Sequence, residues 1–340
     1  MIGDSSYLRK IQKTGGSSYI VALPIEWIRK TKLKKGDAIR IFPQPDGNLL
    51  IQPLETNYRH VGEEVEINTT DIIDKNLILR LILSKYLAGY QVIKVHDQYG
   101  LNFELRTEIE QFVQNLMGVE ILEESNNWMI LKDLSSLESL DLNQLIRRIH
   151  VLADKMFTTA VKAFVNLNKD SVHFIKLQET SVDRLYYLIS RQLNAILSDL
   201  SYSSYLGIKL VEVLDYRVIV KRLESIADHA YDIAGHIVEM VKPIEDDYLL
   251  KEIEKLGEQV KKRYNSAMNC FYNNKVKEAN ELANEKAAFE EELKALYENI
   301  NKLESEIAVR FILVIRSFSR VSSYAADIAE VVINRERGVT

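Results

Sequence analysis

The sequence contains few of the residues that cross-link chains or interrupt helices. Cys270 is the single cysteine among 340 residues, so no intrachain disulfide can form and a reducing compartment is expected. Four of the five prolines fall within the first 53 residues, and Pro243 is the fifth. Because proline and glycine are the main helix breakers, their scarcity between about residues 140 and 335 predicts long helices there.

Long uncharged apolar runs are absent as well. The most apolar segment, LILRLILSKYLAGYQVI, is interrupted by Arg80 and Lys85, and it is too short and too charged to span a bilayer. The opening MIGDSSYLRK has no apolar core of the kind that secretory signals carry. We therefore expect a soluble, cytoplasmic protein that does not insert into membranes.

Charge is unevenly distributed along the chain. Residues 1–54 hold nine Lys or Arg and four acidic residues, whereas the remainder holds 35 basic and 45 acidic residues. The formal net charges of the two parts are therefore +5 and −10. Such asymmetry is typical of a polyanion-binding end on an acidic body, although small domains also differ in charge by chance.

The periodicity predicts a multidomain, mainly α chain that begins with a small β domain. Residues 1–54 alternate like short strands, with a short helix at 25–31 that begins after Pro24. The predicted strands are 7–13, 18–23, 38–43 and 48–52. Residues 55–137 predict a small α/β connector domain, and no motif in it indicates a function. Its predicted helices are 69–88 and 104–117, and its predicted strands are 91–96, 119–123 and 128–132.

The remaining residues predict two tandem three-helix bundles, 138–242 and 243–340, which Pro243 separates. The predicted helices are 142–167, 170–200, 207–241, 246–272, 275–302 and 305–334. An offset of 95 residues aligns LESIADHAYDIA at 223–234 with FSRVSSYAADIA at 318–329, with identical residues at four positions. This similarity indicates an internal duplication in which the third helix of each bundle carries the same signature.

The segment RKIQKTGGSSYIVALPIEWIRKTKLKKGDAIRIF, at residues 9–42, resembles the AbrB/SpoVT/MazE family of swapped-hairpin DNA-binding domains. The basic strand, the GGSS turn, ALPIEWIRK and LKKGD carry the resemblance in that order. So short a β segment cannot close a core alone, and the resemblance implies an intertwined homodimer. It also implies binding to duplex DNA, although some family members neutralise toxins through protein contacts.

The candidate DNA-binding residues lie on this predicted hairpin. Basic side chains suit phosphate contacts, glycines allow close approach of the backbone, and short hydroxyls can contact phosphates or base edges. The candidates are Arg9, Lys10, Gln12, Lys13, Ser17 and Ser18. The alternative is an ordinary Gly-Gly turn beside a solvated basic face.

An acidic stripe on the predicted helix 207–241 is the candidate metal site. Glu224, Asp228 and Asp232 follow one another at intervals of four residues, so they lie on one side of a helix. Glu179 and Asp183 form a second pair at this spacing on the preceding helix. Two such helices packed together would gather several carboxylates, whose repulsion a cation would relieve. An exposed acidic face without metal is the alternative interpretation.

Residues 140–335 resemble the PhoU family, whose helix-bundle repeats carry an E-x-x-x-D motif that binds metal clusters. The resemblance implies a regulator of phosphate uptake that binds a divalent or trivalent ion such as Fe, Zn, Mg or Mn. Together with the AbrB-like head, it implies a one-chain phosphate uptake regulator of the archaeal kind. In the second repeat Ser319 and Ser323 replace the motif, so we expect any metal in the first bundle.

The leading hypothesis is a DNA-binding transcriptional regulator of phosphate uptake, whose helical region senses a signal or binds a partner such as a transporter ATPase. The alternative is a scaffold that does not bind DNA and acts on a phosphate transporter through protein contacts. A metal-dependent enzyme is disfavoured, because the helix of His229 and His236 lacks the Glu-x-x-His pairs that carboxylate-bridged di-iron bundles use. We interpret both histidines as ordinary helix residues.

Overall fold

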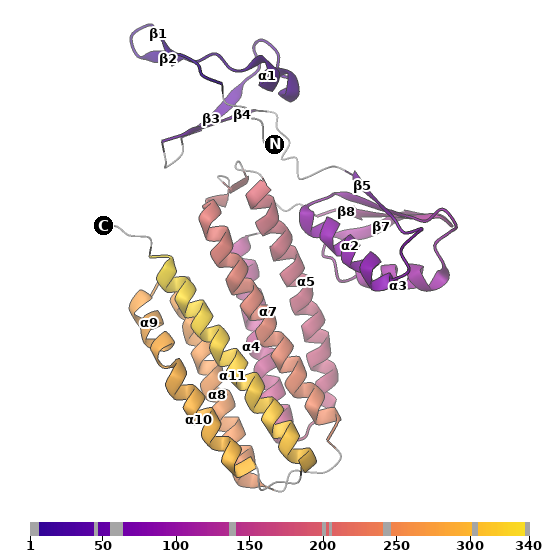
Figure 1. Cartoon of the computed structure of the whole chain (residues 1–340), viewed down its shortest axis with the longest axis vertical. Coiled ribbons are helices and arrows are strands. Elements are labelled where there is room, and N and C mark those ends of the chain that lie inside the picture. Colours follow the sequence, from indigo (N-terminus) through magenta and orange to yellow (C-terminus); the bar gives the residue numbers. More distant parts are fainter. Residues whose placement is uncertain are drawn as a thin grey trace. The chain divides into compact units, whose positions relative to one another are not determined.

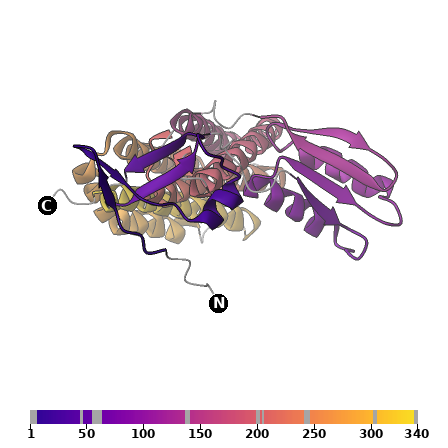
Figure 2. The same ribbon diagram turned by 90° about the horizontal axis from the view of Figure 1, so that it is seen from above.

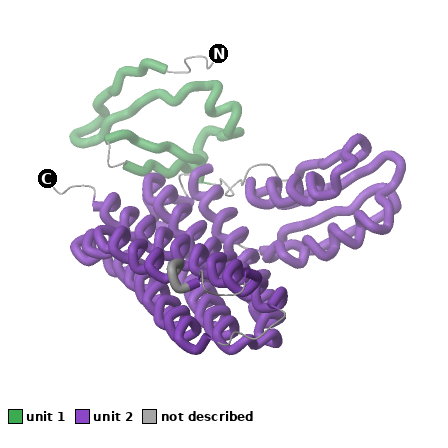
Figure 3. The backbone as a smooth tube through the Cα atoms, turned by 60° about the horizontal axis from the view of Figure 1, so that its bottom comes forward, with its two compact units in different colours: residues 1–59 green, residues 60–340 purple. Residues whose placement is uncertain are grey.

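The computed structural model describes residues 7–43, 47–54, 64–135, 141–198, 202–203, 206–240, 246–300 and 305–336. The chain is mainly helical and forms two compact units, residues 1–59 and 60–340 (Figure 3). The predicted domain boundaries after residues 54, 137 and 242 adjoin or lie in segments outside the described residues, and they stay predictions. None of the described helices is both long enough and apolar enough to cross a membrane.

The first unit contains two antiparallel strand pairs and a short helix (Figure 1). Strands β1 (Gln12–Thr14) and β2 (Ser18–Ile20) form one pair, and β3 (Ile39–Pro43) and β4 (Leu49–Pro53) form the other. Helix α1 (Ile25–Thr31) follows Pro24 as predicted. β1 and β2 are shorter than predicted, because only three residue pairs connect them. Gly15 lies in their turn with a positive φ of 62°, a conformation that favours glycine.

The described part of this first unit lacks a buried apolar core. No residue of α1 is buried, and Leu8 is 96% exposed. Ile11, Tyr19 and Ile25 are also largely exposed. Exposed apolar side chains on so small a unit support the predicted intertwined dimer, in which a second copy would cover them.

The second unit begins with a four-stranded sheet that two helices cover on one face (Figures 1 and 2). The elements are β5 (Glu64–Asn68), α2 (Lys75–Ala88), β6 (Val92–His96), α3 (Phe103–Val113), β7 (Val119–Glu124) and β8 (Trp128–Asp133). The strand order is β5-β6-β8-β7, with β5 and β6 parallel and the other neighbours antiparallel. Alternate apolar residues of β6 and β8 pack against Ile78, Ile82 and Tyr86 of α2 in a common core.

The prediction of a helix at 69–88 was wrong at its start, because α2 begins at Lys75. Strand β5 was not predicted. Thr69 continues the sheet edge, because its backbone N–H donates to the carbonyl of His96 at 2.8 Å. Helix α2 begins only after Asp74, whose carboxylate accepts a hydrogen bond from the backbone N–H of Asn76. The N-cap therefore sets the start of α2, and the apolar periodicity alone placed it too early.

Seven long or medium helices complete the described second unit. They are α4 (Leu142–Val165), α5 (Asp170–Ser198), α7 (Leu210–Val238), α8 (Asp247–Asn273), α9 (Val276–Asn284), α10 (Lys286–Ile300) and α11 (Ser305–Asn334). Helices α4, α5 and α7 form one bundle, and α8 to α11 form another. The bundles lie side by side, with α7 against α11 and α4 against α8 (Figure 1). Phe157 joins them through rings of Tyr264 and Phe318, each with centroids 5.8 Å away.

The prediction of one helix at 275–302 was wrong, because α9 and α10 are separate helices. The guanidinium of Arg263 on α8 donates to the carbonyl of Leu282 and to the carboxylate of Glu285, both at 3.1 Å. In an uninterrupted helix, the Leu282 carbonyl would accept from the N–H of Lys286. At the break, the Leu282 carbonyl therefore accepts a hydrogen bond from the buried Arg263 of α8 in place of a backbone N–H of its own helix.

A buried arginine also joins the sheet domain to the first bundle. Arg191 of α5 is fully buried, and it donates to the carbonyls of Tyr86, Gly89 and Tyr90 at the C-terminal end of α2. Its guanidinium lies 2.5 Å from the carboxylate of Asp133. Carbonyls at the end of a helix carry partial negative charge, so this arrangement surrounds one buried cation with acceptors.

Gly257 of α8 allows the two bundles to approach each other. A Cβ at this position would lie 2.7 Å from Val161 Cγ1 of α4, whereas no atom lies within 4 Å of a Cβ added to Gly235 of α7. We predict that Gly257→Ala lowers the free energy of unfolding by about 1 kcal/mol or more through overpacking. Gly235→Ala, the matched control, should raise it by up to about 1 kcal/mol through helix propensity. Thermal and urea unfolding measure both, and equal stabilisation by the two substitutions would contradict the close approach.

The exposed apolar residues of the first unit predict dimerisation through that unit. The full chain should sediment as a dimer at micromolar concentration, and a chain without residues 1–59 should sediment as a monomer. Analytical ultracentrifugation of both proteins measures this. A full chain that is monomeric, or a truncated chain that is still dimeric, would contradict the prediction.

Candidate functional site

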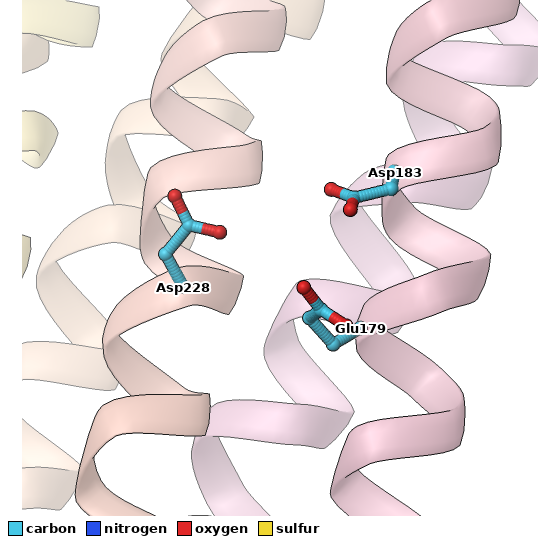
Figure 4. A group of neighbouring side chains, drawn as sticks. All are labelled: Glu179, Asp183 and Asp228. Carbon is cyan, nitrogen blue, oxygen red and sulfur yellow. The ribbon is translucent and has the colours of Figure 1, made fainter. Parts of the chain in front are cut away.

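Three carboxylates converge between α5 and α7. Glu179 and Asp183 project from α5, and Asp228 faces them from α7 (Figure 4). One carboxylate oxygen from each residue lies within 4.8 Å of the others. The four-residue spacing on α5 brings Glu179 and Asp183 to one face of the helix, and the packing of α5 against α7 adds Asp228.

The environment of the cluster opposes its full ionisation. Burial raises the pKa of Asp183 to about 7, and the neighbouring carboxylates of Glu179 and Glu224 contribute to this rise. Burial and the carboxylate of Glu224 also raise the pKa of Asp228, and burial raises that of Glu179. Desolvation and like charge act in the same direction, so the ionised cluster is costly without a counter-ion.

Glu224 lies beside the cluster but already has a cationic partner. The residue is only 8% exposed, and Lys221 Nζ donates to its two carboxylate oxygens at 2.6 and 2.5 Å. The hydroxyl of Ser225 donates to it at 3.2 Å. The structure thus places Glu224 next to Asp183 and Asp228 as an ion-paired neighbour.

The structure does not bring Asp232 to the other carboxylates. Its side chain is 59% exposed, and its carboxylate lies 3.7 Å from Nδ1 of His229 on the same helix. Eight residues separate Asp232 from Glu224, which rotates its position by about 80° around the helix. The stripe is therefore too wide for all three of its members to face α5.

The donor set of Glu179, Asp183 and Asp228 fits a hard cation. Carboxylate oxygens suit Mg²⁺, Mn²⁺ or ferric iron, whereas Zn²⁺ favours nitrogen and sulfur ligands. The group assembled from the described residues contains neither histidine nor cysteine. Three protein ligands would leave coordination positions for water or another small ligand.

The corresponding position of the second bundle is built differently. Asp327 of α11 pairs with Arg222 Nε of α7 at 2.7 Å. His229 lies within hydrogen-bond distance of the hydroxyls of Ser317 and Tyr324, at 3.3 and 3.4 Å, so it connects α7 to α11. These contacts fit the interpretation of His229 as an ordinary helix residue, and the ion pair gives Asp327 a partner within the chain.

The six candidate DNA-binding residues lie on the β1–β2 hairpin or directly before it. Every one of them is exposed: Arg9, Lys10, Gln12, Lys13, Ser17 and Ser18. The guanidinium of Arg9 lies over the Tyr7 ring, 5.6 Å from its centroid. An exposed hairpin with basic side chains and an open glycine turn can contact a polyanion.

The sequence interpretation did not single out Lys221. Its three-residue spacing from Glu224 was the available signal, because residues three apart are neighbours on a helix. This spacing alone does not distinguish Lys221 from the i,i+3 ion pairs on exposed helix faces, such as Lys275 with Glu278. Here it matters because Glu224 is buried beside the other carboxylates.

Two segments of the chain, residues 146–237 and 253–332, match the model of the PhoU domain, and together they make up about half of the chain. The chain belongs to the PhoU family. Each matched segment lies within one bundle. The segments end at residues 237 and 332, which are 95 residues apart, and this is the offset that aligns 223–234 with 318–329. The internal duplication is therefore confirmed.

The N-terminal unit of this PhoU-family chain is similar to a second family. Residues 12–59 match the model described as antidote-toxin recognition MazE, bacterial antitoxin. The predicted combination of a MazE-like N-terminal unit with a PhoU-like body is thus confirmed.

One solved structure agrees on the fold of the body, and a second is similar to a lesser degree. The phosphate transport system regulatory protein PhoU from Streptococcus pneumoniae is 16% identical, with a TM-score of 0.50, and the match covers 58% of this chain and 94% of that protein. PhoU from Pseudomonas aeruginosa is 19% identical, with a TM-score of 0.46, and the match covers 59% of this chain and 98% of that protein. No curated protein matches the chain significantly.

The carboxylate cluster predicts a metal-dependent gain in stability for this PhoU-family protein. Asp183→Asn with Asp228→Asn keeps the side-chain volumes and removes two ligand charges, so it should abolish bound metal and any rise in melting temperature on adding Mn²⁺. Asp232→Asn is the matched control on the same helix as Asp228 and should change neither. Elemental analysis of protein purified without chelator, together with thermal unfolding, tests this. Equal metal content in the two variants, or no metal in the native protein, would contradict metal binding by the cluster. The cluster would then be an acidic face without a bound ion.

The raised pKa of Asp183 predicts a pH dependence for the metal-free protein. Its pKa is about 7 in the folded chain and 3.8 by its ordinary value, so folding favours the protonated carboxyl. Stability from this group is present below about pH 4 and is lost as pH rises through 7. Relative to Asp183→Asn, the native protein should therefore lose stability between about pH 4 and 7 and change little above that, as urea unfolding in chelator can measure. A constant difference between the two proteins would contradict the shift.

Proposed function

We propose that this protein is a DNA-binding transcriptional regulator of phosphate uptake, in which a PhoU-type body carries a metal ion and a MazE-like head binds DNA. The observation that carries the proposal is the combination within one chain of a head with an exposed basic hairpin and a PhoU-family body. Solved PhoU proteins with the same fold include one described as a phosphate transport system regulatory protein. The proposed role is regulatory rather than enzymatic.

The body would hold the metal ion through Glu179, Asp183 and Asp228. The ion supplies positive charge that neutralises the converging carboxylates, and it cross-links α5 to α7. Because α5 also carries Arg191, which binds α2 and Asp133, metal binding would stiffen the connection between the first bundle and the sheet domain. This gives the body two states that differ in charge and in rigidity.

The head would bind duplex DNA as a dimer. Lys10 and Lys13 are exposed on the hairpin, and Ser17 and Ser18 are exposed in and beside its turn. Basic side chains supply the salt-dependent part of DNA affinity, whereas short hydroxyls and the open backbone at Gly16 suit close contacts.

A regulatory scaffold is the second candidate function. The family model that matches the head is described by its recognition of a toxin, which is a protein contact. In this alternative the head captures or dimerises with a protein, and the body acts on a phosphate transporter ATPase. The alternative predicts weak DNA binding that head substitutions do not change.

The two candidates differ in the salt dependence of DNA binding by the full chain. Fluorescence anisotropy with a generic duplex of about 30 base pairs, and with the DNA upstream of phosphate transporter genes, measures affinity as salt is varied. The log–log slope should fall by about 1 for each phosphate that is no longer neutralised, hence by about 2 for Lys13→Ala in a dimer. Lys10→Ala should have the same effect. Lys251→Ala, an exposed lysine of α8, is the control and should leave the slope unchanged.

The scaffold is favoured by a specific pattern of results. Binding that is weak on both duplexes, and equally dependent on salt in all three variants, would falsify DNA recognition by the hairpin. A preference for the upstream DNA, with Lys13→Ala weakening binding to both duplexes alike, would support phosphate contact by Lys13 and readout by other residues.

A further inference from the structure

The carboxylates between α5 and α7 form an incomplete set around a resident cation. Glu179, Asp183 and Asp228 face one another without a basic partner in the group, whereas Glu224 accepts two hydrogen bonds from Lys221. The negative charge of Glu224 nevertheless acts on Asp183 and Asp228, so all four carboxylates belong to one electrostatic site. Among the described residues of this site, Lys221 is the cation in direct contact with a carboxylate.

Lys221 is held in this position from two sides. Its Nζ lies 2.5 Å from Glu224 on the same helix, and it lies 5.3 Å from the centroid of the Tyr186 ring on α5. The aromatic ring attracts the ammonium and limits its freedom. Lys221 thus takes one acceptor position on each carboxylate oxygen of Glu224, and its ammonium cannot itself coordinate a metal, because it has no lone pair.

The charge balance of the site then depends on Lys221. Four carboxylates can balance two divalent ions, as in sites where two metals lie about 4 Å apart. With the ammonium of Lys221 present, a second divalent ion would change the net charge of the site from −1 to +1, whereas without Lys221 two divalent ions fully offset the four carboxylates.

We propose that Lys221 occupies a second cation position and thereby restricts the first bundle to a single metal ion. The ammonium sequesters Glu224 as an outer neighbour, and Glu179, Asp183 and Asp228 hold the ion. Lys221 is accordingly a residue that determines metal stoichiometry. This inference rests on the metal-binding part of the proposed function.

The test compares metal stoichiometry among four variants of the full chain, with Mn²⁺ as the probe. Lys221→Gln removes the ammonium and frees Glu224, whereas Lys221→Arg keeps a cation there. Lys176→Gln is the matched control, because it removes a positive charge near Glu179 on α5 without freeing Glu224. The double variant Lys221→Gln with Glu224→Gln removes the freed ligand. Equilibrium dialysis with elemental analysis gives the ratio of Mn²⁺ to protein, and electron paramagnetic resonance distinguishes isolated from magnetically coupled Mn²⁺.

The native protein, Lys221→Arg and Lys176→Gln should each bind one Mn²⁺ with the six-line signal of an isolated ion. Lys221→Gln should bind two and show a coupled signal, and the double variant should return to one. Thermal unfolding identifies any variant that does not fold, and Lys221→Met, which also removes the ammonium and is expected to bind two ions, takes the place of Lys221→Gln if that variant fails. Two ions in the native protein, or one in a folded Lys221→Gln, would overturn the inference while leaving metal binding intact. A native protein that binds no Mn²⁺ would instead overturn the metal-binding proposal itself, and this inference with it.

Discussion

Repulsion between carboxylates at the contact of α5 and α7 is the constraint around which the first bundle is organised. The two helices pack through buried apolar side chains along most of their length, yet Glu179, Asp183 and Asp228 meet at the same interface. Partial burial removes the solvent that would otherwise screen these charges. The interface is consequently stable in either of two conditions, with protons on the carboxyls or with a cation between them. A protein whose helix contact depends on such a ligand is suited to report the presence of that ligand.

The distribution of charge between the two units has a physical consequence for regulation. A basic head favours association with a polyanion, while an acidic body of net charge −10 opposes it at long range. Neutralising carboxylates in the body reduces this opposition. In the function proposed above, metal binding and DNA binding would thus be coupled through electrostatics even without a change in shape, and the coupling would weaken as salt screens the charges.

The sequence was informative where one local pattern decides the structure. Apolar periodicity and the absence of proline located the long helices, and four-residue spacing brought Glu179 and Asp183 to one helix face. The sequence was uninformative where a residue far away in the chain determines the local structure. The break between α9 and α10 has no proline or glycine at Glu285, and it depends on Arg263 from another helix. Strand β5 is short and has charged residues on its open face, so its apolar alternation was too brief to separate from a loop.

The candidate site shows the same division. Spacing on α5 and α7 was sufficient to gather the acidic candidates, but it could not state which member of the stripe on α7 faces α5. The helix rotation between Glu224 and Asp232 leaves Asp228 in the middle, and it places Asp232 toward solvent. The number of carboxylates that can bind a cation also depends on Lys221. Its pairing with Glu224 becomes significant only because the structure shows Glu224 to be buried. The head residues are all exposed, and exposure alone does not state what they bind.

Arg191 gives α5 a mechanical role. Asp183 and Arg191 lie eight residues apart on one rigid helix, roughly 12 Å along its axis. Arg191 is bound by three carbonyls at the end of α2 and by Asp133, so it ties the sheet domain to this part of α5. A rotation of α5 at the carboxylates would therefore either carry the end of α2 with it or break these bonds.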